Sequence, residues 1–215
     1  MNAKQIVFTG INRAELLDAE CREPGADEVI VKMAYTTVSQ GTERANISGN
    51  LDVHAFKPRS GETPVFPRYG GYSGAGTVYA VGDNVTEFKA GDRVAGWWGL
   101  HKSYCEFPKT NLIKLEGEIA LNAASVAHIA CFPMGAIRKT RLEIGESALV
   151  MGLGILGMLA VQELRAAGAA PIIAVDLLES RRKQAMDSGA DLALDSGDPG
   201  FVQAVKEITG GGANA

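Results

Sequence analysis

The chain has 215 residues, of which 46% are hydrophobic and 21% charged, and its formal net charge is −4. This mildly acidic balance excludes a basic surface for nucleic acid or anionic membrane, and the apolar runs are too short to span a bilayer. The first residues lack the apolar core of a signal peptide, and three dispersed cysteines predict no disulfide framework. We therefore expect a soluble protein of the reduced cytoplasm, without nucleic-acid or membrane partners.

Short β-strand patterns fill residues 1 to about 120, with Gly and Asn at the turns between them. The expected strands lie at residues 5–9, 15–19, 28–35, 74–81, 88–95 (a turn leading into a strand), 103–107 and 111–115. A polar passage at residues 39–69 predicts one long loop, and such loops are usually functional or mobile. This part of the chain therefore predicts a β-barrel or sandwich domain, residues 1–120.

The pattern becomes helical after residue 119, so we place a second domain at residues 121–215. Two helices are expected at 123–129 and 135–142. Short apolar strands and helices then alternate, as in a parallel sheet covered by helices. Strands are expected at 148–151, 172–176 and 191–194, and helices at 156–167, at 179–188 and from Pro199 onwards, where a first helical residue is often proline.

A G-x-G-x-x-G motif follows the first of these strands, at residues 152–157. Gly152 allows the tight turn, Gly154 lets the backbone approach a pyrophosphate, and Gly157 lets the helix pack close to the strand. The helix N-terminus at Ile155 and Leu156 offers N–H groups to the phosphates. Asp176 ends the next strand about 20 residues on, where an acid accepts hydrogen bonds from an adenosine ribose. The strand, helix and acid together favour dinucleotide binding over a glycine turn that binds nothing.

Four motifs together resemble the medium-chain dehydrogenase/reductase family, which includes the zinc-type alcohol dehydrogenases. They are Gly71-Tyr-Ser-Gly-Ala-Gly76, Val81-Gly-Asp-Asn-Val85, Phe88-Lys-Ala-Gly-Asp-Arg-Val94 and the glycine motif at 152–157. The resemblance implies a GroES-like β-barrel domain followed by a Rossmann domain. It also implies NAD(P)-dependent chemistry on a carbonyl or alcohol of a small-molecule substrate.

The chain departs from the zinc members of that family at the ligand positions. Ser39 stands where a zinc cysteine is usual. Tyr72 and Ser73 replace the histidine and the glutamate of the usual Gly-His-Glu motif. Only His128, near the third ligand position, could coordinate a metal, and one histidine does not hold a catalytic zinc. The four-cysteine structural lobe is also missing. We therefore expect no zinc, and a hydrogen-bond donor in its place.

The candidate catalytic donors are Ser39, Thr42, Tyr72 and His128. Each has a second interpretation that stays open. His128 is a proton donor or residual ligand, or a hydrogen-bonded helix histidine. Tyr72 donates a proton to a substrate oxygen, or is a barrel-wall residue. Ser39 and Thr42 bind the nicotinamide ribose or relay a proton, or are turn hydroxyls bonded to their own backbone.

Other aromatic and basic residues receive weaker predictions. Trp97 and Trp98 are expected to pack in a core or interface rather than line a cleft, and His54 and His101 are expected at the surface. The basic residues 181–183 lie on the helix beyond Asp176. Because that carboxylate repels a 2′-phosphate, NAD is favoured over NADP.

Members of the family are considerably longer than this chain, which supplies only three parallel strands. We therefore expect a fragment, a truncated form or a degraded gene product that keeps the adenosine half of the cofactor site. Strand 148–151 is expected as an unpaired edge that favours homo-oligomers. The predicted function is a zinc-independent NAD(H) oxidoreductase acting on a carbonyl, alcohol or activated alkene. The alternative is a catalytically silent nucleotide-binding or scaffold protein.

Overall fold

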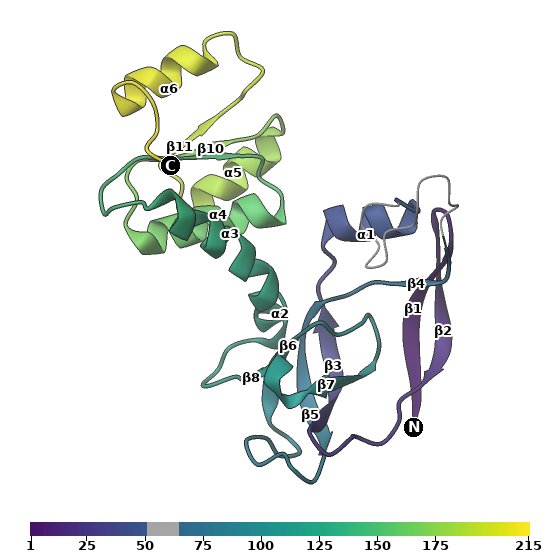
Figure 1. The fold of residues 1–215 in the computed structure, drawn as a ribbon. Helices are drawn as coiled ribbons and strands as arrows, with labels where there is room; N and C mark the ends of the chain where they lie inside the picture. Colours follow the sequence, from purple (N-terminus) through teal and green to yellow (C-terminus); the bar gives the residue numbers. More distant parts are fainter. Residues whose placement is uncertain (51–64) are drawn as a thin grey trace. The chain divides into compact units, whose positions relative to one another are not determined.

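The computed structural model describes residues 1–50 and 65–215 (Figure 1). The chain divides into two units, Met1–His128 and Ile129–Ala215. His54, which we expected at the surface, lies outside the described residues. Residues 51–64 of the polar passage at 39–69 also lie outside them. None of the described helices is long and apolar enough to cross a membrane.

The first unit is built from two antiparallel sheets. The smaller sheet has the order β2-β1-β4, with a long hairpin of β1 (Asn2–Gly10) and β2 (Arg13–Glu20) and a short β4 (Arg68–Tyr69). The larger sheet has the order β7-β3-β5-β6-β8. Its strands are β3 (Glu28–Thr36), β5 (Ser73–Val81), β6 (Arg93–Trp97), β7 (Tyr104–Pro108) and β8 (Leu112–Lys114). An isolated bridge between Gln5 and Lys102 joins the two sheets.

Alternating apolar residues of the larger sheet make the core of this unit. Val29, Val31, Val94 and Phe107 are all at most 1% exposed. Burying such side chains stabilises a fold by about 1.5–3 kcal/mol each. Two of the three cysteines belong to these clusters: Cys105 packs with the valines, and Cys21 packs with Ala3 and Ile30, whereas Cys131 is exposed on a helix of the second unit.

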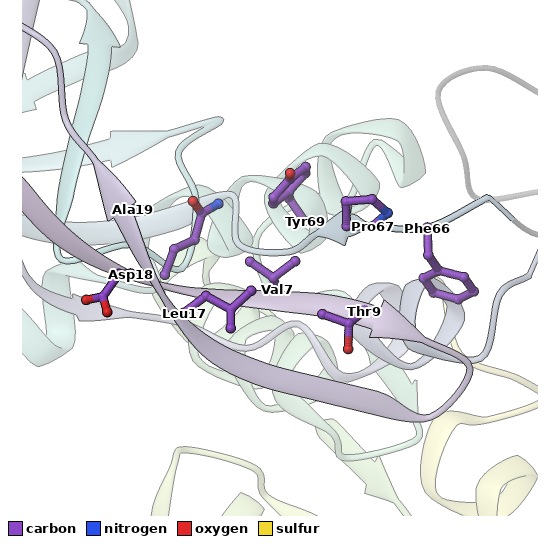
Figure 2. Close-up of a pocket in the computed structure, with 9 residues that line it drawn as sticks. Val7, Thr9, Leu17, Asp18, Ala19, Phe66, Pro67 and Tyr69 are labelled. Carbon is purple, nitrogen blue, oxygen red and sulfur yellow. The ribbon is translucent and has the colours of Figure 1, made fainter.

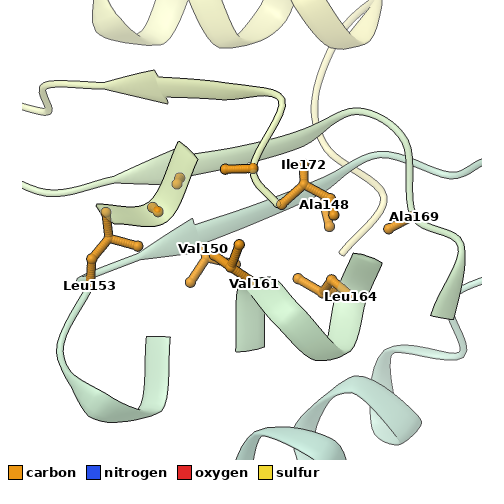
Figure 3. Packing of buried hydrophobic residues seen from close by; sticks show 10 residues of the cluster. Ala148, Val150, Leu153, Val161, Leu164, Ala169 and Ile172 are labelled. Carbon is orange, nitrogen blue, oxygen red and sulfur yellow. The ribbon is translucent and has the colours of Figure 1, made fainter. Parts of the chain in front are cut away.

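The second unit is a parallel sheet with helices. Its strands β9 (Ala148–Met151), β10 (Ile172–Val175) and β11 (Leu192–Leu194) have the order β11-β10-β9. The helices are α3 (Ala127–Thr140), which begins just before the boundary, α4 (Ile155–Ala167), α5 (Glu179–Asp187) and α6 (Phe201–Thr209). Figure 3 shows how Val161 and Leu164 of α4 pack against Val150 and Ile172 of the sheet. Gly168 ends α4 in the left-handed conformation, which favours glycine.

Four helix predictions are corrected by the structure. The predicted loop at 39–69 contains α1 (Gln40–Ile47). The helix expected at 123–129 is instead α2 (Leu121–Ala124) and the start of α3, and α3 continues through Pro133 and Gly135, so no separate helix begins at 135. Pro199 lies in a turn rather than in α6, because the N–H groups of Gly200 and Phe201 both donate to Asp198.

Strand β9 lies at the edge of the parallel sheet, as the sequence predicts, but the start of this edge is paired rather than unpaired. The Leu149 N–H donates to the Ala215 carbonyl at 2.8 Å, and the Ala215 N–H donates to the Ser147 carbonyl at 3.2 Å. This pattern is that of a parallel bridge opposite Ala148. The Asn214 side chain also accepts from the Ser147 N–H and hydroxyl. The last two residues therefore cover the start of this edge.

Candidate functional site

The glycine turn of the second unit has the geometry that its sequence predicts. Gly152 has a φ of +88°, which favours glycine. At Gly157 a Cβ would lie 1.9 Å from the Gly152 carbonyl oxygen, so the helix and the turn approach as closely as backbones can. Gly154 is the N-cap of α4, and no atom lies within 4 Å of the position of its missing Cβ. The turn therefore leaves open space beside the helix N-terminus that begins at Ile155.

Asp176 follows β10 and is hydrogen-bonded to this turn. Its carboxylate accepts the Leu153 N–H at 2.8 Å and the Leu178 N–H at 2.9 Å. These backbone donors, Leu178 first, lower the pKa of the Asp176 carboxyl. Asp176 Oδ1 accepts only the Leu178 N–H among these bonds and has a second lone pair, so the group can still accept a hydrogen bond from a diol.

Arg181 lies closer to this acid than the sequence suggests. Its guanidinium is 3.4 Å from Asp176 Oδ2, although it lies on α5. Arg182 donates to the Asp176 carbonyl at 2.7 Å and to the Asp195 carboxylate at 2.9 Å. The two arginines thus fix the strand end that carries the acid, and Arg181 reduces its negative potential.

Large apolar side chains are exposed beyond the carboxyl ends of β9 and β10. Met151 is 63% exposed, Leu177 is 66% exposed and Leu178 is 52% exposed. Carboxyl ends of parallel strands are where open α/β sheets bind ligands. These side chains offer an apolar surface for a planar base. Sequence reasoning missed them, although an apolar pair directly after the strand-ending acid was a visible signal.

The predicted polar residues of the first unit form two separate pairs. Ser39 precedes α1, and its hydroxyl donates to the Thr42 hydroxyl at 3.4 Å. Tyr72 and His128 lie ring to ring, with centroids 5.6 Å apart. Ser73, next to Tyr72, donates instead to a backbone carbonyl of Ser125 at 2.6 Å, so its hydroxyl serves the fold.

An aromatic cluster surrounds His128. The Trp98 ring lies 5.4 Å from His128 and 5.9 Å from Tyr72, and the Trp97 ring stacks on His128 at 6.2 Å. Trp98 is 67% exposed, so it does not pack in the core of this unit, while packing at an interface stays a prediction. Its φ of +61° is unusual for a bulky residue, and its N–H donates to the Tyr72 carbonyl. Burial lowers the pKa of the His128 imidazole, which favours the neutral ring.

His101 is buried, at 6% exposure, and its predicted surface position is wrong. Its Nε2 lies 3.2 Å from the carboxylate of Glu43, and its Nδ1 lies 2.8 Å from the Thr36 hydroxyl. The same carboxylate accepts the Gly71 N–H at 2.9 Å. Sequence reasoning missed Glu43, because its partners are far away along the chain.

The donor atoms of the described residues do not fit a zinc ion held by protein ligands. A catalytic zinc needs three protein ligands. Within residues 1–50 and 65–215, no group of three His, Cys, Asp or Glu side chains is arranged to hold a metal ion. Ser39 and Tyr72 carry hydroxyls, and Glu43 and His101 bind each other.

A surface cavity of about 510 Å³ lies beside the β1–β2 hairpin (Figure 2). Val7 and Leu17 project from the two strands of the hairpin towards it. Phe66, Pro67 and Tyr69 border it from the segment at 66–69. None of the site residues predicted from the sequence lines this cavity, so we do not place the functional site there.

Comparison with known proteins gives two family matches. Residues 25–141 match the alcohol dehydrogenase GroES-like domain, and residues 156–215 match the zinc-binding dehydrogenase family. The (R,R)-butanediol dehydrogenase of Bacillus subtilis is 26% identical over 228 residues, which cover 94% of this chain and 65% of that protein. The chain thus spans less than two thirds of the length of this curated relative.

Solved structures share the fold over nearly the whole chain. A quinone oxidoreductase of Pseudomonas syringae is 29% identical, with a TM-score of 0.80, and the match covers 97% of this chain and 63% of that one. A short chain alcohol dehydrogenase of Escherichia coli, solved with NADH, is 21% identical, with a TM-score of 0.82 over 96% of this chain and 66% of that one. Because the GroES-like match alone exceeds half of the sequence, the chain belongs to the medium-chain dehydrogenase/reductase family, with a GroES-like domain followed by a Rossmann-type domain.

Proposed function

We propose that the protein is an NAD(H)-dependent oxidoreductase that acts on a carbonyl, an alcohol or an activated alkene without a catalytic zinc. The observation that carries this proposal is the hydrogen bond from the Leu153 N–H to Asp176. It brings the strand-ending acid to the glycine turn, which is the arrangement that binds the adenosine half of a dinucleotide. Several relatives are named dehydrogenases, which supports the reaction class.

The residues of the second unit would hold the cofactor through three kinds of contact. The open space at Gly154 admits a pyrophosphate to the N-terminus of α4. Asp176 accepts from the ribose hydroxyls, and Leu177 contacts the base. NAD is favoured over NADP because a phosphate would face this carboxylate, although Arg181 at 3.4 Å reduces the difference. Bound nicotinamide would supply or accept the hydride.

The first unit would supply the hydrogen-bond donor to the substrate oxygen. The candidates are the hydroxyls of Ser39, Thr42 and Tyr72 and the imidazole of His128. Tyr72 is favoured, because it lies against His128 and the exposed Trp98, which together form a surface that a small organic substrate can contact. When the substrate carbon accepts hydride, such a donor passes a proton to the oxygen; in the reverse direction it takes the proton back.

Calorimetry with NAD and with AMP on the 215-residue chain tests the cofactor assignment. Similar weak affinities for both nucleotides would support binding through the adenosine half alone. Much tighter NAD binding with measurable turnover would contradict binding through the adenosine half alone. A substrate screen of the protein encoded by the complete reading frame, followed by NADH absorbance, tests the reaction.

A second candidate function is a catalytically silent nucleotide-binding or scaffold protein. It is favoured by one observation, that Ser39 and Tyr72 carry hydroxyls at the positions where zinc ligands are usual in the family. Turnover by the complete protein excludes this candidate, whereas nucleotide binding without turnover of any tested alcohol or carbonyl supports it.

A further inference from the structure

A buried hydrogen-bonded pair joins three segments of the first unit. Glu43 of α1 and His101 are 7% and 6% exposed. Glu43 Oε1 accepts the Gly71 N–H at 2.9 Å and lies 3.2 Å from His101 Nε2. A carboxylate oxygen accepts hydrogen bonds, so the bond between these two atoms needs the imidazole proton on Nε2. We call these two residues the Glu43–His101 pair.

Two consecutive glycines make room for this pair. At Gly70 a Cβ would lie 2.1 Å from Glu43 Oε2, and at Gly71 a Cβ would lie 2.5 Å from the His101 backbone nitrogen. The His101 N–H also donates to the Gly70 carbonyl at 3.0 Å. The carboxylate and the imidazole are therefore held against backbone, with no side chain between them and the segment at 70–71.

Each segment that the pair joins carries a candidate site residue. Thr42 directly precedes Glu43, Tyr72 directly follows Gly71, and Trp98 lies three residues before His101. Trp98 is in turn hydrogen-bonded through its N–H to the Tyr72 carbonyl. A shift of the pair must therefore move the groups that we assign to substrate contact.

The Glu43–His101 pair contributes little to the stability of the fold. Glu43 Oε2 is buried and has no hydrogen-bond partner among the described residues. A buried polar atom without a partner costs about 1–3 kcal/mol. Buried ion pairs are often no more stabilising than apolar residues of the same volume. A buried, half-satisfied carboxylate therefore indicates a requirement for position rather than for stability.

We propose that Glu43 and His101 are positioning residues, which fix α1, the segment at 70–72 and the loop at 98–101 so that Thr42, Tyr72 and Trp98 face the substrate. This inference rests on the proposed function. The pair itself does not touch substrate, because both side chains are buried.

The first test needs no turnover. The chain has three histidines and two tryptophans, so their ring N–H signals are easily resolved by NMR. Glu43→Gln should shift the His101 Nε2–H and the Trp98 indole signals. Glu28→Gln is the matched control, because it removes the ion pair with Arg22 in the same unit and should leave both signals unchanged. An unchanged Trp98 indole signal in Glu43→Gln would overturn the proposal.

The second test uses the complete protein. Glu43→Gln and His101→Asn should each lower kcat roughly 10- to 100-fold with KM nearly unchanged, since a misplacement of about 1 Å costs rates of this order. The double variant should cost no more than either single variant, because the residues act as one unit. Additive effects, or a change in KM alone, would overturn the positioning role. Absence of turnover in the unsubstituted protein would instead overturn the proposed function and this role with it, whatever the NMR shows of the pair.

Discussion

Gly157 faces the carbonyl oxygen of Gly152 so closely that a Cβ at residue 157 would lie 1.9 Å from that oxygen. Backbone oxygen cannot move away as a flexible side chain can. Gly157→Ala should therefore lower the free energy of unfolding of the second unit by about 1–3 kcal/mol, as overpacking usually does. Chemical unfolding followed by circular dichroism measures this change.

The matched control for this prediction is Gly135→Ala. Gly135 also lies in a helix, α3, but no atom lies within 4 Å of its missing Cβ. Alanine should stabilise that helix by roughly 0.5–1 kcal/mol. Equal stability of the Gly157→Ala protein and the unsubstituted protein would contradict the close approach described here.

Gly154→Ala separates folding from nucleotide binding. Its Cβ would meet nothing within 4 Å, so the loss of stability should stay below about 1 kcal/mol, the scale of an N-cap change. The methyl group would nevertheless occupy the space that we assign to a pyrophosphate. ADP affinity measured by calorimetry should fall at least about tenfold, a difference of about 1.4 kcal/mol. Unchanged ADP affinity would remove the pyrophosphate from this position.

Asp176→Ala should weaken the binding of NAD more than that of NADP. The carboxylate accepts from the ribose in our assignment, and hydrogen bonds to charged groups contribute about 1.5–3 kcal/mol, or roughly tenfold to a hundredfold in affinity. Since Leu153 and Leu178 also donate to Asp176, folding of the variant must be checked first. Tighter binding of NADP than NAD by the unsubstituted protein would refute the assignment.

Glu28 predicts a specific loss of stability in acid. Hydrogen bonds from the Arg22 side chain and then from the Gly25 N–H lower the pKa of Glu28 from 4.5 to about 2. A lowered carboxyl pKa stabilises the folded state above the unfolded pKa, and this contribution is lost as the pH falls from about 4.5 towards 2. Glu28→Gln should remove this part of the acid sensitivity, and Arg22→Gln should remove most of it.

Tryptophan fluorescence is the measurement for Glu28, because Trp97 and Trp98 both lie in the first unit. Urea unfolding at several pH values gives the free energy of unfolding of each protein. The difference in this free energy between the unsubstituted protein and the Glu28→Gln variant should be constant near neutral pH. The gap should narrow below about pH 4.5. A gap that is the same at pH 3 and pH 7 would show that Glu28 keeps its ordinary pKa.

Protein purified without added metal should contain no stoichiometric zinc. The residues at the usual ligand positions are Ser39 and Tyr72, and the described residues contain no group of three side chains that could hold a metal ion. Elemental analysis measures the metal content. Near-stoichiometric zinc that disappears in His128→Ala would show that a metal site exists after all.

Local patterns predicted much of the fold, but they failed where distant residues decide. The glycine turn, β9 and the cap at Gly168 follow from residues near each other in the sequence. Helix α1 has few apolar residues, and its buried residue, Glu43, is held by His101, which is 58 positions away. No window of sequence contains that contact, so both the helix and the burial of His101 were missed.

The candidate site shows the same division. Asp176 could be assigned from its distance to the glycine motif, because the two are linked by one strand–helix–strand unit. Trp98 was expected to pack in a core or an interface, because its side chain is large and mostly apolar. Its exposure follows from a positive φ and from a hydrogen bond to Tyr72, neither of which is encoded in hydrophobicity.

Because the cysteines differ in burial, the rate of thiol labelling can report local opening of the first unit. Burial raises the pKa of Cys105 to about 11 and also raises the pKa of Cys21, so neither thiol of the first unit reacts readily while it is folded. Cys131 is exposed and belongs to the second unit. A thiol reagent should therefore modify Cys131 at once, and the slow labelling of the other two then records how often the first unit opens.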